Sequence, residues 1–289
     1  MPELPEVEII KRGLKEKIVG KTIDNVEVRA EKSFQGKPEE IKGSKIESIE
    51  RKAKMIVIAL SNGKYLLVHL KLTGQLVFDH KAGDKSGRVA GGHPSKDWVA
   101  DLPNKFTHVI LHFTDGSVLY FNDLRKFGYI KLLNKDELEN QNLYKNLGPE
   151  PYSKDLTPEY LMKIFSRRPK AKIKQLIMNQ SVIAGVGNIY ADESLFCAKV
   201  SPSRLAKDMK RPELVKILEC LKKVMDFSIA HGGSSENTFV DVEGKQGRMQ
   251  DYFKVYQKTG QKCPNNCGGT IKRITLGGRG THYCPNCQK

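Results

Sequence analysis

The spacing of hydrophobic residues changes early in the chain. Near the start, apolar residues recur at helical spacing, at Val7, Ile10, Leu14 and Ile18. From about residue 22 to 133 they fall instead into short β-type runs such as KMIVIAL, YLLVHL and HVILHF. Asn62-Gly63 and Asp115-Gly116 separate such runs, and both pairs favour antiparallel hairpins. The pattern predicts an N-terminal helix followed by a β-sandwich or flattened barrel.

The spacing changes again beyond residue 133. Residues 134–151 are polar and contain prolines, so we expect a domain boundary there. Thr157-Pro158 then starts a helical region, with helices predicted over 158–165, 171–179, 188–198 and 212–230. Within the β region, residues 79–104 are polar and lack a period, which indicates a long surface loop.

The charge of the chain points to its partner. Lysine and arginine total 49 against 33 acidic residues, a net charge of +16. Such a surplus attracts polyanions, and nucleic acid is the leading candidate. An anionic membrane is the rival, but no apolar run approaches the roughly 20 residues of a membrane span, and no signal segment is evident. We therefore expect a cytoplasmic protein.

Four cysteines form the strongest local motif. They lie in a C-x3-C and a C-x2-C pair, as Cys263, Cys267, Cys284 and Cys287. This spacing predicts one structural Zn²⁺ with a β-hairpin between the pairs. The hairpin tip is expected to present Lys272, Arg273 and Arg279, either to a phosphate backbone or as a solvated basic loop. Cys197 and Cys220 are interpreted as small buried apolar residues.

Glycines interrupt the helical pattern in MNQSVIAGVGNIYADESLF. Two short helices around this turn could present backbone N–H groups to an anion, with Gly185 and Gly187 in the turn and Asn188 as the N-cap. The alternative is an ordinary helical hairpin whose glycines only permit close packing. The positive charge favours a DNA-binding helix-turn-helix.

Three further positions carry weaker signals. In FNDLRKFGYI, Arg125 and Phe127 could point to the same side of an extended segment, as a cation and a flat wedge, although Phe127 could equally be a core residue. Lys54 begins a buried strand and His69 ends another. Taken alone, these two indicate a solvated strand edge and a structural histidine.

The first residues, MPELPEVE, raise a question of chemistry. Pro5 and the acids suit the start of a helix, but Pro2 lies too early for that role. If Met1 is removed, Pro2 becomes a secondary amine, and a terminal amine titrates near about 7.7 to 8.0, so part of it is nucleophilic at neutral pH. Its adduct with a sugar C1′ is an iminium, and Glu3 and Glu6 could transfer protons.

An ordered set of motifs carries a resemblance over the whole chain: MPELPEVE, RKAK, HLKLTG, NDLRKFG, LGPEP, GVGNIYADESLF, HGGSS and CPNC. With them the sequence closely resembles bacterial formamidopyrimidine-DNA glycosylases, which act as 8-oxoguanine DNA glycosylases and AP lyases. The resemblance implies that Pro2 attacks C1′, that Glu3 assists ring opening, and that β- and δ-elimination follow. It makes Lys54 the catalytic lysine and Arg279 the zinc-hairpin arginine that holds phosphates.

The resemblance also implies DNA contacts. His69 and Asn188 match backbone-contact positions, and Arg168 and Lys174 lie near basic phosphate contacts. Three residues match those that fill the gap left by an everted base: Leu72, where methionine is usual, Arg125 and Phe127. A DNA-contacting histidine is replaced by Phe106, which leaves His108 as the nearest basic neighbour.

Together these features predict an α+β fold. The expected divisions are an N-terminal helix and β-sandwich over 1–133, a linker over 134–152, a helical domain with a helix-two-turn-helix over 153–254, and a zinc finger over 255–289. A lesion-capping loop is expected at 232–253. The expected partner is double-stranded DNA with oxidised purines or abasic sites, bound by a monomer in the cytoplasm at the nucleoid.

Two other classes remain open on the sequence. One is a non-catalytic zinc protein that binds DNA, and the other is an RNA or ribosome factor. Both would leave Pro2 without a chemical role. Reduction with borohydride distinguishes them, because only an enzyme that works through an imine becomes covalently attached to lesion DNA.

Overall fold

The computed structural model describes residues 1–82, 89–92, 101–234 and 247–289. The chain divides into two compact units: unit 1 is Met1–Lys145 with Ile229–Gln250, and unit 2 is Asn146–Ser228 with Asp251–Lys289. The polypeptide thus returns to unit 1 after the long helix of unit 2. The helical domain predicted over 153–254 stays a prediction.

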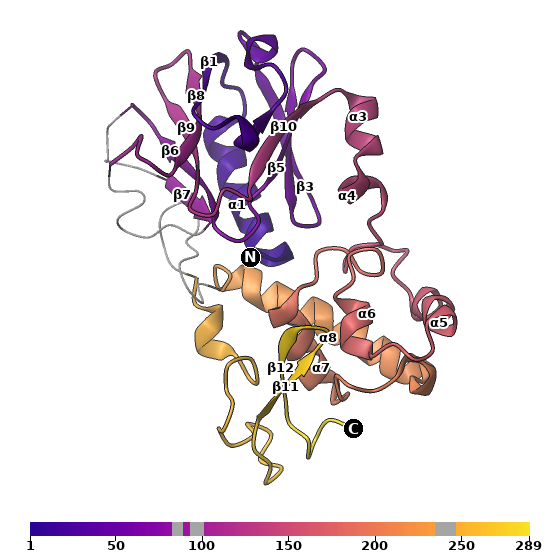
Figure 1. The fold of residues 1–289 in the computed structure, drawn as a ribbon. Helices are drawn as coiled ribbons and strands as arrows, with labels where there is room; N and C mark the ends of the chain where they lie inside the picture. Colours follow the sequence, from indigo (N-terminus) through magenta and orange to yellow (C-terminus); the bar gives the residue numbers. More distant parts are fainter. Residues whose placement is uncertain (83–88, 93–100, 235–246) are drawn as a thin grey trace. The chain divides into compact units, whose positions relative to one another are not determined.

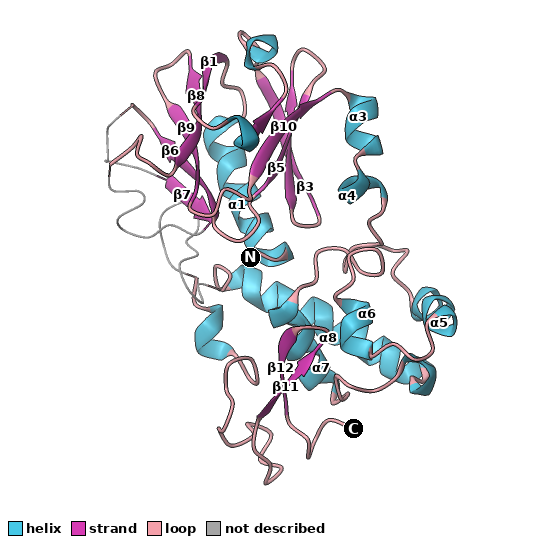
Figure 2. Cartoon of the chain, in the orientation of Figure 1, coloured by secondary structure: helices cyan, strands magenta, loops and turns pink. Residues whose placement is uncertain are grey.

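Unit 1 contains an N-terminal helix, α1 (Leu4–Ile18), and two five-stranded sheets (Figures 1 and 2). The first sheet has the order β1 (Ile23–Val28), β8 (Thr107–Phe113), β9 (Val118–Asp123), β6 (Gly74–Asp79) and β7 (Val89–Gly92). The second has the order β2 (Phe34–Gln35), β10 (Tyr129–Leu133), β5 (Tyr65–His69), β4 (Met55–Leu60) and β3 (Ile46–Lys52). Strands β2 and β10 pair in parallel, and the other described pairs are antiparallel.

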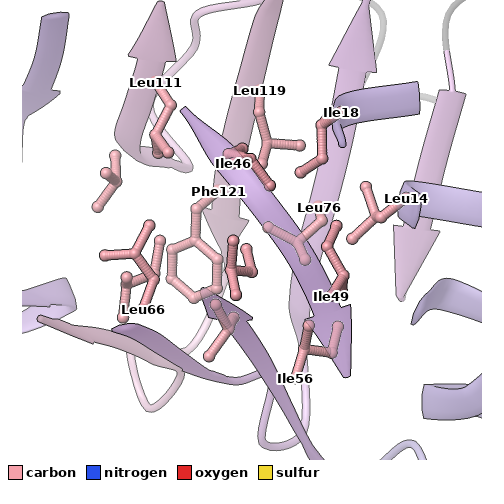
Figure 3. Packing of buried hydrophobic residues seen from close by; sticks show 14 of the residues in the cluster. Leu14, Ile18, Ile46, Ile49, Ile56, Leu66, Leu76, Leu111, Leu119 and Phe121 are labelled. Atoms are coloured by element: carbon pink, nitrogen blue, oxygen red, sulfur yellow. The ribbon is translucent and has the colours of Figure 1, made fainter. Parts of the chain in front are cut away.

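The two sheets and α1 share one hydrophobic core (Figure 3). Each sheet contributes alternate residues of its strands, for example Phe121 of β9 and Ile56 of β4, while α1 contributes Leu14 and Ile18. All four side chains are almost fully buried. Burial of each such side chain contributes on the order of 2 kcal/mol, so this core fixes α1 against both sheets.

The hairpin and helix predictions in unit 1 are confirmed. Gly63, in the turn between β4 and β5, and Gly116, between β8 and β9, have φ angles of 78° and 83°. The predicted loop over 79–104 is partly wrong, because residues 89–92 form strand β7 against β6. Residues 83–88 and 93–100 of that loop lie outside the described residues.

Short helices complete unit 1. The 3-10 helix η1 lies between β1 and β2, η2 lies between β2 and β3, and α3 and α4 follow β10. Their bounds are η1 (Glu31–Ser33), η2 (Pro38–Ile41), α3 (Lys135–Asn140) and α4 (Asn142–Lys145). A fourth 3-10 helix, η4 (Met249–Tyr252), lies where the chain passes between the units.

Unit 2 consists of helices and one β-hairpin. Its elements are α5 (Pro158–Arg167), α6 (Ile173–Ile177), α7 (Asn188–Ala198), η3 (Ala206–Asp208), α8 (Arg211–Ala230), β11 (Lys272–Leu276) and β12 (Arg279–Tyr283). Thr157 caps α5 by accepting a hydrogen bond from the Tyr160 N–H at 3.1 Å. Helix α6 is shorter than predicted because Lys172 forms a β-bridge with Leu205.

A disulfide joins α7 to α8. Cys197 and Cys220 have Cα atoms 5.8 Å apart and are bonded through sulfur. Their interpretation as separate apolar residues is therefore wrong. The sequence gives no signal for the pair, because the packing of two helices decides which cysteines meet.

None of the helices in the described ranges combines the length and hydropathy that a membrane-spanning helix requires.

Candidate active site and nucleic-acid interface

The N-terminal segment of unit 1 is held by a carboxylate. Pro2 and Glu3 are buried at the start of α1, where Glu3 is the N-cap. Glu6 Oε2 accepts a hydrogen bond from the Glu3 N–H at 2.9 Å, and Glu6 Oε1 accepts one from the Ser234 N–H at 3.0 Å. Both oxygens of Glu6 therefore hold backbone N–H groups, one at Glu3 and one at Ser234. The proton-transfer role predicted for Glu6 stays a prediction, and Glu3 is the acid adjacent to Pro2.

Lys54 lies in the two-residue turn between β3 and β4 and is only 7% exposed. Arg51 anchors this turn to α1, because its guanidinium contacts Glu8 at 2.9 Å and the Ala53 carbonyl at 3.1 Å. Burial raises the pKa of Glu8, but hydrogen bonds from Arg12 and Arg51 outweigh it and lower the pKa below its usual value. The ion pair thus fixes the turn that carries Lys54.

His69 ends β5 and is buried. Its Nδ1 accepts a hydrogen bond from the Lys71 N–H at 3.0 Å. Burial, together with the positive charges of Lys71 and Lys54, lowers the pKa of His69 to about 3. The imidazole is therefore neutral at physiological pH, and because Nδ1 accepts, Nε2 carries the proton. His69 can act as a neutral hydrogen-bond donor beside two cations.

Two exposed apolar residues lie in neighbouring loops of unit 1. Leu72 follows β5 and is 37% exposed, and Phe127 follows β9 and is 55% exposed. The Arg125 guanidinium lies 5.1 Å from the centroid of the Phe127 ring, so the two side chains share one side of their loop. Such exposure excludes the alternative that Phe127 is a core residue.

His108 is buried in β8 next to the end of β9. It is only 3% exposed, and its Nε2 lies 2.7 Å from the backbone oxygen of Asp123. Since a carbonyl only accepts, Nε2–H is the donor. The DNA contact predicted for His108 stays a prediction, while its observed partner is the backbone of Asp123.

The sequence analysis gave no role to Thr73 and Asp123. Thr73 lies directly after Leu72, and Asp123 ends β9 and is 1% exposed. The Asp123 carboxylate accepts hydrogen bonds from the Thr73 hydroxyl and from the backbone of the loop that carries Arg125. An aspartate two residues before a loop N–H is an Asx-turn signal that could have been noted.

Unit 2 holds the predicted metal site. The sulfur atoms of its four cysteines all lie within 4.8 Å of one another: Cys263, Cys267, Cys284 and Cys287. Two sulfur pairs are separated by 3.5 Å. Tetrahedral Zn²⁺ with Zn–S bonds of about 2.3 Å requires sulfur separations of about 3.8 Å, so the four thiolates fit one structural zinc.

Strands β11 and β12 form the predicted hairpin after the first cysteine pair (yellow in Figure 1). Arg279 is exposed and directly follows the Gly277-Gly278 turn, so it lies at the hairpin tip. Lys272 pairs with Tyr283 at the opposite end, and Arg273 with His282 next to it. The prediction that all three basic residues lie at the tip holds only for Arg279.

Asn188 is the first residue of α7 and is not its N-cap. Gly187 holds the N-cap position, and no side chain caps the helix. The Asn188 side chain instead donates a hydrogen bond to the Gly280 carbonyl at 3.0 Å, which connects α7 to β12. Arg168 follows α5 and is exposed, as expected for a phosphate contact.

Lys174 is buried at 1% exposure. Its Nζ lies 2.7 Å from Asp192 Oδ1 and 2.8 Å from the Thr281 hydroxyl. Asp192 also accepts a hydrogen bond from the His282 N–H at 2.8 Å. The lysine is thus enclosed between α6, α7 and β12, and the phosphate contact predicted for it stays a prediction. Asp192 lies one helical turn beyond Asn188, a spacing that could have indicated a shared face.

Comparisons with protein families match three consecutive parts of the chain. Residues 1–130 match the formamidopyrimidine-DNA glycosylase N-terminal domain. Residues 147–240 match the formamidopyrimidine-DNA glycosylase H2TH domain. Residues 260–289 match a zinc finger found in FPG and IleRS.

Relatives and solved structures agree with these matches over the full length. A formamidopyrimidine-DNA glycosylase from Listeria innocua is 39% identical over 297 residues, covering 100% of both chains. One from Pelotomaculum thermopropionicum is 38% identical and covers 100% of this chain and 99% of the relative. A complex of Lactococcus lactis Fpg with DNA containing an abasic site has a TM-score of 0.85 at 30% identity, covering 99% of each chain. The wild-type Lactococcus lactis protein bound to N7-benzyl-Fapy-dG DNA gives 0.85 at 31% identity, covering 100% of each.

Proposed function

This chain belongs to the formamidopyrimidine-DNA glycosylase family, and from that membership we propose how its own residues bind damaged DNA and carry out the reaction. It is a DNA glycosylase of oxidised-purine repair, with the AP lyase activity that is typical of the family. The solved structures similar to this chain contain DNA with an abasic site or with N7-benzyl-Fapy-dG, so duplexes with abasic or Fapy lesions are the proposed substrates.

Pro2 is the proposed nucleophile, once removal of Met1 has created its secondary amine. The amine attacks C1′, the bond from C1′ to the base breaks, and the base leaves with a proton. Glu3 then protonates O4′ as the C1′–O4′ bond opens, which gives a cationic iminium between C1′ and the Pro2 nitrogen. The observation that carries this proposal is the buried Pro2-Glu3 start of α1, held by both oxygens of Glu6.

Strand cleavage follows from the iminium. Loss of a proton from C2′ forms a double bond between C1′ and C2′. The bond from C3′ to the 3′ phosphate then breaks, and this phosphate leaves. A second elimination expels the 5′ phosphate, so both ends of the gap carry phosphates. Water then releases Pro2 from the sugar fragment. Positive charge close to the leaving phosphates favours both steps, because it offsets the developing negative charge.

Lys54 and His69 form the proposed phosphate and sugar contacts of unit 1. Lys54 lies close enough to His69 for its positive charge to lower the pKa of the imidazole. Lys54 supplies the cation, and His69 donates a neutral hydrogen bond through Nε2. In unit 2, the proposed backbone contacts are Arg279, Asn188 and Arg168, of which Arg279 holds the phosphates flanking the lesion.

Leu72, Arg125 and Phe127 are the proposed gap-filling residues. Two are exposed apolar side chains, and the third is a cation stacked on one of them. When a paired base leaves the helix, the loss of its stacking and pairing costs a few kcal/mol. The inserted side chains replace part of the lost stacking. The proposed capping loop is 232–253, of which 235–246 lie outside the described residues.

We propose that the protein acts as a monomer on DNA at the nucleoid, in the cytoplasm. The proposed division is 1–133, a linker over 134–152, a helical domain over 153–254 and a zinc finger over 255–289. The net charge of +16 supports sequence-independent contact with phosphates.

Borohydride trapping tests the nucleophile. A duplex with 8-oxoguanine opposite cytosine is incubated with the processed protein and reductant, and the covalent complex is quantified on a denaturing gel. The wild-type protein is expected to be trapped, and Pro2→Gly should lose most trapping while retaining binding to abasic DNA. Mass spectrometry should place the crosslink on residue 2.

Pro5→Ala is the matched control, because Pro5 lies in the first turn of the same helix but has no free amine. This variant should be trapped like the wild type. Trapping that survives in Pro2→Gly, or a crosslink mapped to another side chain, would show that the assigned nucleophile is wrong. A wild-type protein that binds lesion DNA without being trapped would indicate a non-catalytic binder.

A further inference from the structure

The hydroxyl group of Thr73 connects the loops that carry Leu72 and Arg125. The Thr73 hydroxyl donates to Asp123 Oδ1 and also accepts a hydrogen bond from the Arg125 N–H at 3.1 Å. Thr73 is the immediate neighbour of Leu72. The residue after Leu72 therefore contacts the backbone of Arg125 through its side chain.

Asp123 fixes both ends of the second loop. Its Oδ1 accepts from the Arg125 N–H at 3.1 Å, and its Oδ2 accepts from the Gly128 N–H at 2.6 Å. Residues 124–127 therefore span between two hydrogen bonds to the same carboxylate. The backbone of Asp123 is itself held, since its carbonyl accepts from His108 and its N–H donates to the Phe106 carbonyl at 3.0 Å.

Both loops contain strained backbone beside their exposed side chains. Lys71 has φ 51° and precedes Leu72, and Lys126 has φ 57° and lies between Arg125 and Phe127. A non-glycine residue in this region costs about 1 kcal/mol or more and persists where its surroundings hold it. The hydrogen bonds of Thr73 and Asp123 help to hold these two loops, together with the bond from the Lys71 N–H to His69.

Gly128 leaves room for this arrangement. A Cβ atom at this position would lie 2.9 Å from the Phe121 ring and 3.1 Å from Asp123 Oδ2. A side chain at residue 128 would therefore crowd both the Phe121 ring and the Asp123 carboxylate. The chemistry of Asp123, Thr73 and Gly128 is that of a fixed support, not of a group that contacts DNA.

We propose that Thr73 and Asp123 are positioning residues that join the two loops into one rigid wedge, and that this link controls eversion of the damaged base without taking part in the chemistry at C1′. The inference rests on the proposed function, which assigns Leu72, Arg125 and Phe127 to the gap. A wedge with fixed parts enters the base stack without first ordering its loops, so the entropic cost of insertion is lower.

Thr73→Val tests the link, because valine retains the shape of threonine and lacks the hydroxyl. We expect about a tenfold slower single-turnover excision of 8-oxoguanine opposite cytosine, equivalent to the loss of one or two hydrogen bonds at the transition state. The fluorescence change of 2-aminopurine beside the lesion should slow by the same factor. Cleavage of a preformed abasic site should remain within about twofold of wild type, because no base has to be unstacked.

Three further variants complete the experiment. Thr73→Ser retains the hydroxyl and should restore excision. Asp123→Asn retains one acceptor oxygen and loses the other, so it should slow excision and spare abasic cleavage. Ser117→Ala is the matched control, because Ser117 Oγ contacts Asp115 Oδ1 at 2.6 Å in the turn before the same strand, β9. Ser117→Ala removes one side-chain hydrogen bond at the opposite end of β9. This variant should excise the lesion and cleave the abasic site at wild-type rates.

The outcomes separate this inference from the proposed function. If the wild type excises the lesion and Thr73→Val slows both substrates equally, or neither, the link does not act on eversion and the inference fails alone. If the wild type excises no lesion, the proposed function fails and the inference fails with it. Selective slowing of excision with normal thermal unfolding supports the wedge.

Discussion

Lys54 and Lys174 are both buried lysines, yet they serve different purposes. Lys174 is enclosed in unit 2 and is paired with Asp192 at 2.7 Å. Lys54 lies in a turn of unit 1 beside His69, on which its charge acts. A buried charge requires compensation, and the identity of the compensating group decides whether a lysine supports the fold or binds an anion. The histidines divide in the same way, since His108 supports the backbone of Asp123 while His69 is the proposed DNA contact.

His69 should make stability depend on pH. Its pKa is about 3 in the folded protein against 6.5 for an ordinary histidine, so between these values the unfolded chain binds the extra proton. The free energy of unfolding therefore falls as pH decreases below about 6.5, by up to about 1.4 kcal/mol per pH unit. Denaturant unfolding of His69→Gln between pH 4.5 and 7 should show a slope smaller by about one proton, with exposed His80→Gln as the control. If the free energy of unfolding of His69→Gln depends on pH as steeply as that of the wild type, the assignment of a neutral, buried imidazole is wrong.

Removing the charge of Lys174 should affect the fold more than DNA binding. Lys174→Met leaves Asp192 buried without its cation, so we expect the free energy of unfolding to fall by about 3 to 5 kcal/mol. Arg168→Ala, at an exposed site, should leave stability within about 0.5 kcal/mol and reduce the salt dependence of DNA affinity by about one counterion. Denaturant titrations and salt titrations of binding measure the two effects. If Lys174→Met is stable and lowers the salt dependence, Lys174 contacts phosphate after all.

At the scale of elements, the described structure of unit 2 depends on connections between helices and the hairpin. Helix α7 contacts β12 through Asn188 and Asp192, and its next residue, Glu193, accepts hydrogen bonds from three backbone N–H groups of Lys254, Val255 and Tyr256. One helix therefore orients both the start of the zinc-finger segment and the strand that carries Arg279. Helix α7 therefore helps to determine where Arg279 lies within unit 2.

The disulfide between α7 and α8 should stabilise unit 2. Closing a segment with a sequence separation of 23 residues restricts the unfolded chain and contributes about 3 kcal/mol. We expect the denaturation midpoint to fall when the oxidised protein is reduced. A Cys197→Ser and Cys220→Ser double variant is the control, since its midpoint should not respond to the reductant. A response of equal size in the double variant would assign the effect to the zinc cysteines.

At the scale of the whole molecule, charge and metal determine how the protein meets DNA. The surplus of 16 positive charges supplies a general attraction to phosphates, while zinc holds the hairpin on which Arg279 lies. The four thiolates pack in a small cluster with Phe196, Val255 and Ile271, and α7 adds hydrogen bonds to β12. Zinc and α7 therefore both support this hairpin.

Zinc removal should separate folding from DNA binding. A chelator added in mild denaturant should release one equivalent of zinc, measured by a colorimetric dye, and should abolish lesion binding. Circular dichroism should retain the β signal, because the core of unit 1 contains no metal ligand among the described residues. Readdition of Zn²⁺ restores binding if the site is structural. Persistent binding by the metal-free protein would contradict this role of the hairpin.

The sequence by itself determined the elements whose signals are local. The amphipathic α1, the hairpins at Gly63 and Gly116, and the zinc cysteines follow from spacing and turn chemistry over a few residues. Motifs resembling a known family supplied the reaction and its candidate residues. Such features are readable because neighbours along the chain impose them.

Only the tertiary structure decided which polar side chains are enclosed. The burial of Lys174 and His108, the pairing of Cys197 with Cys220, and the contact of Thr73 with Asp123 all join residues distant in sequence. No local pattern specifies such contacts, since they depend on how helices and strands pack. The buried partners of a basic residue in a DNA-binding sequence therefore have to be known before the residue is assigned to DNA.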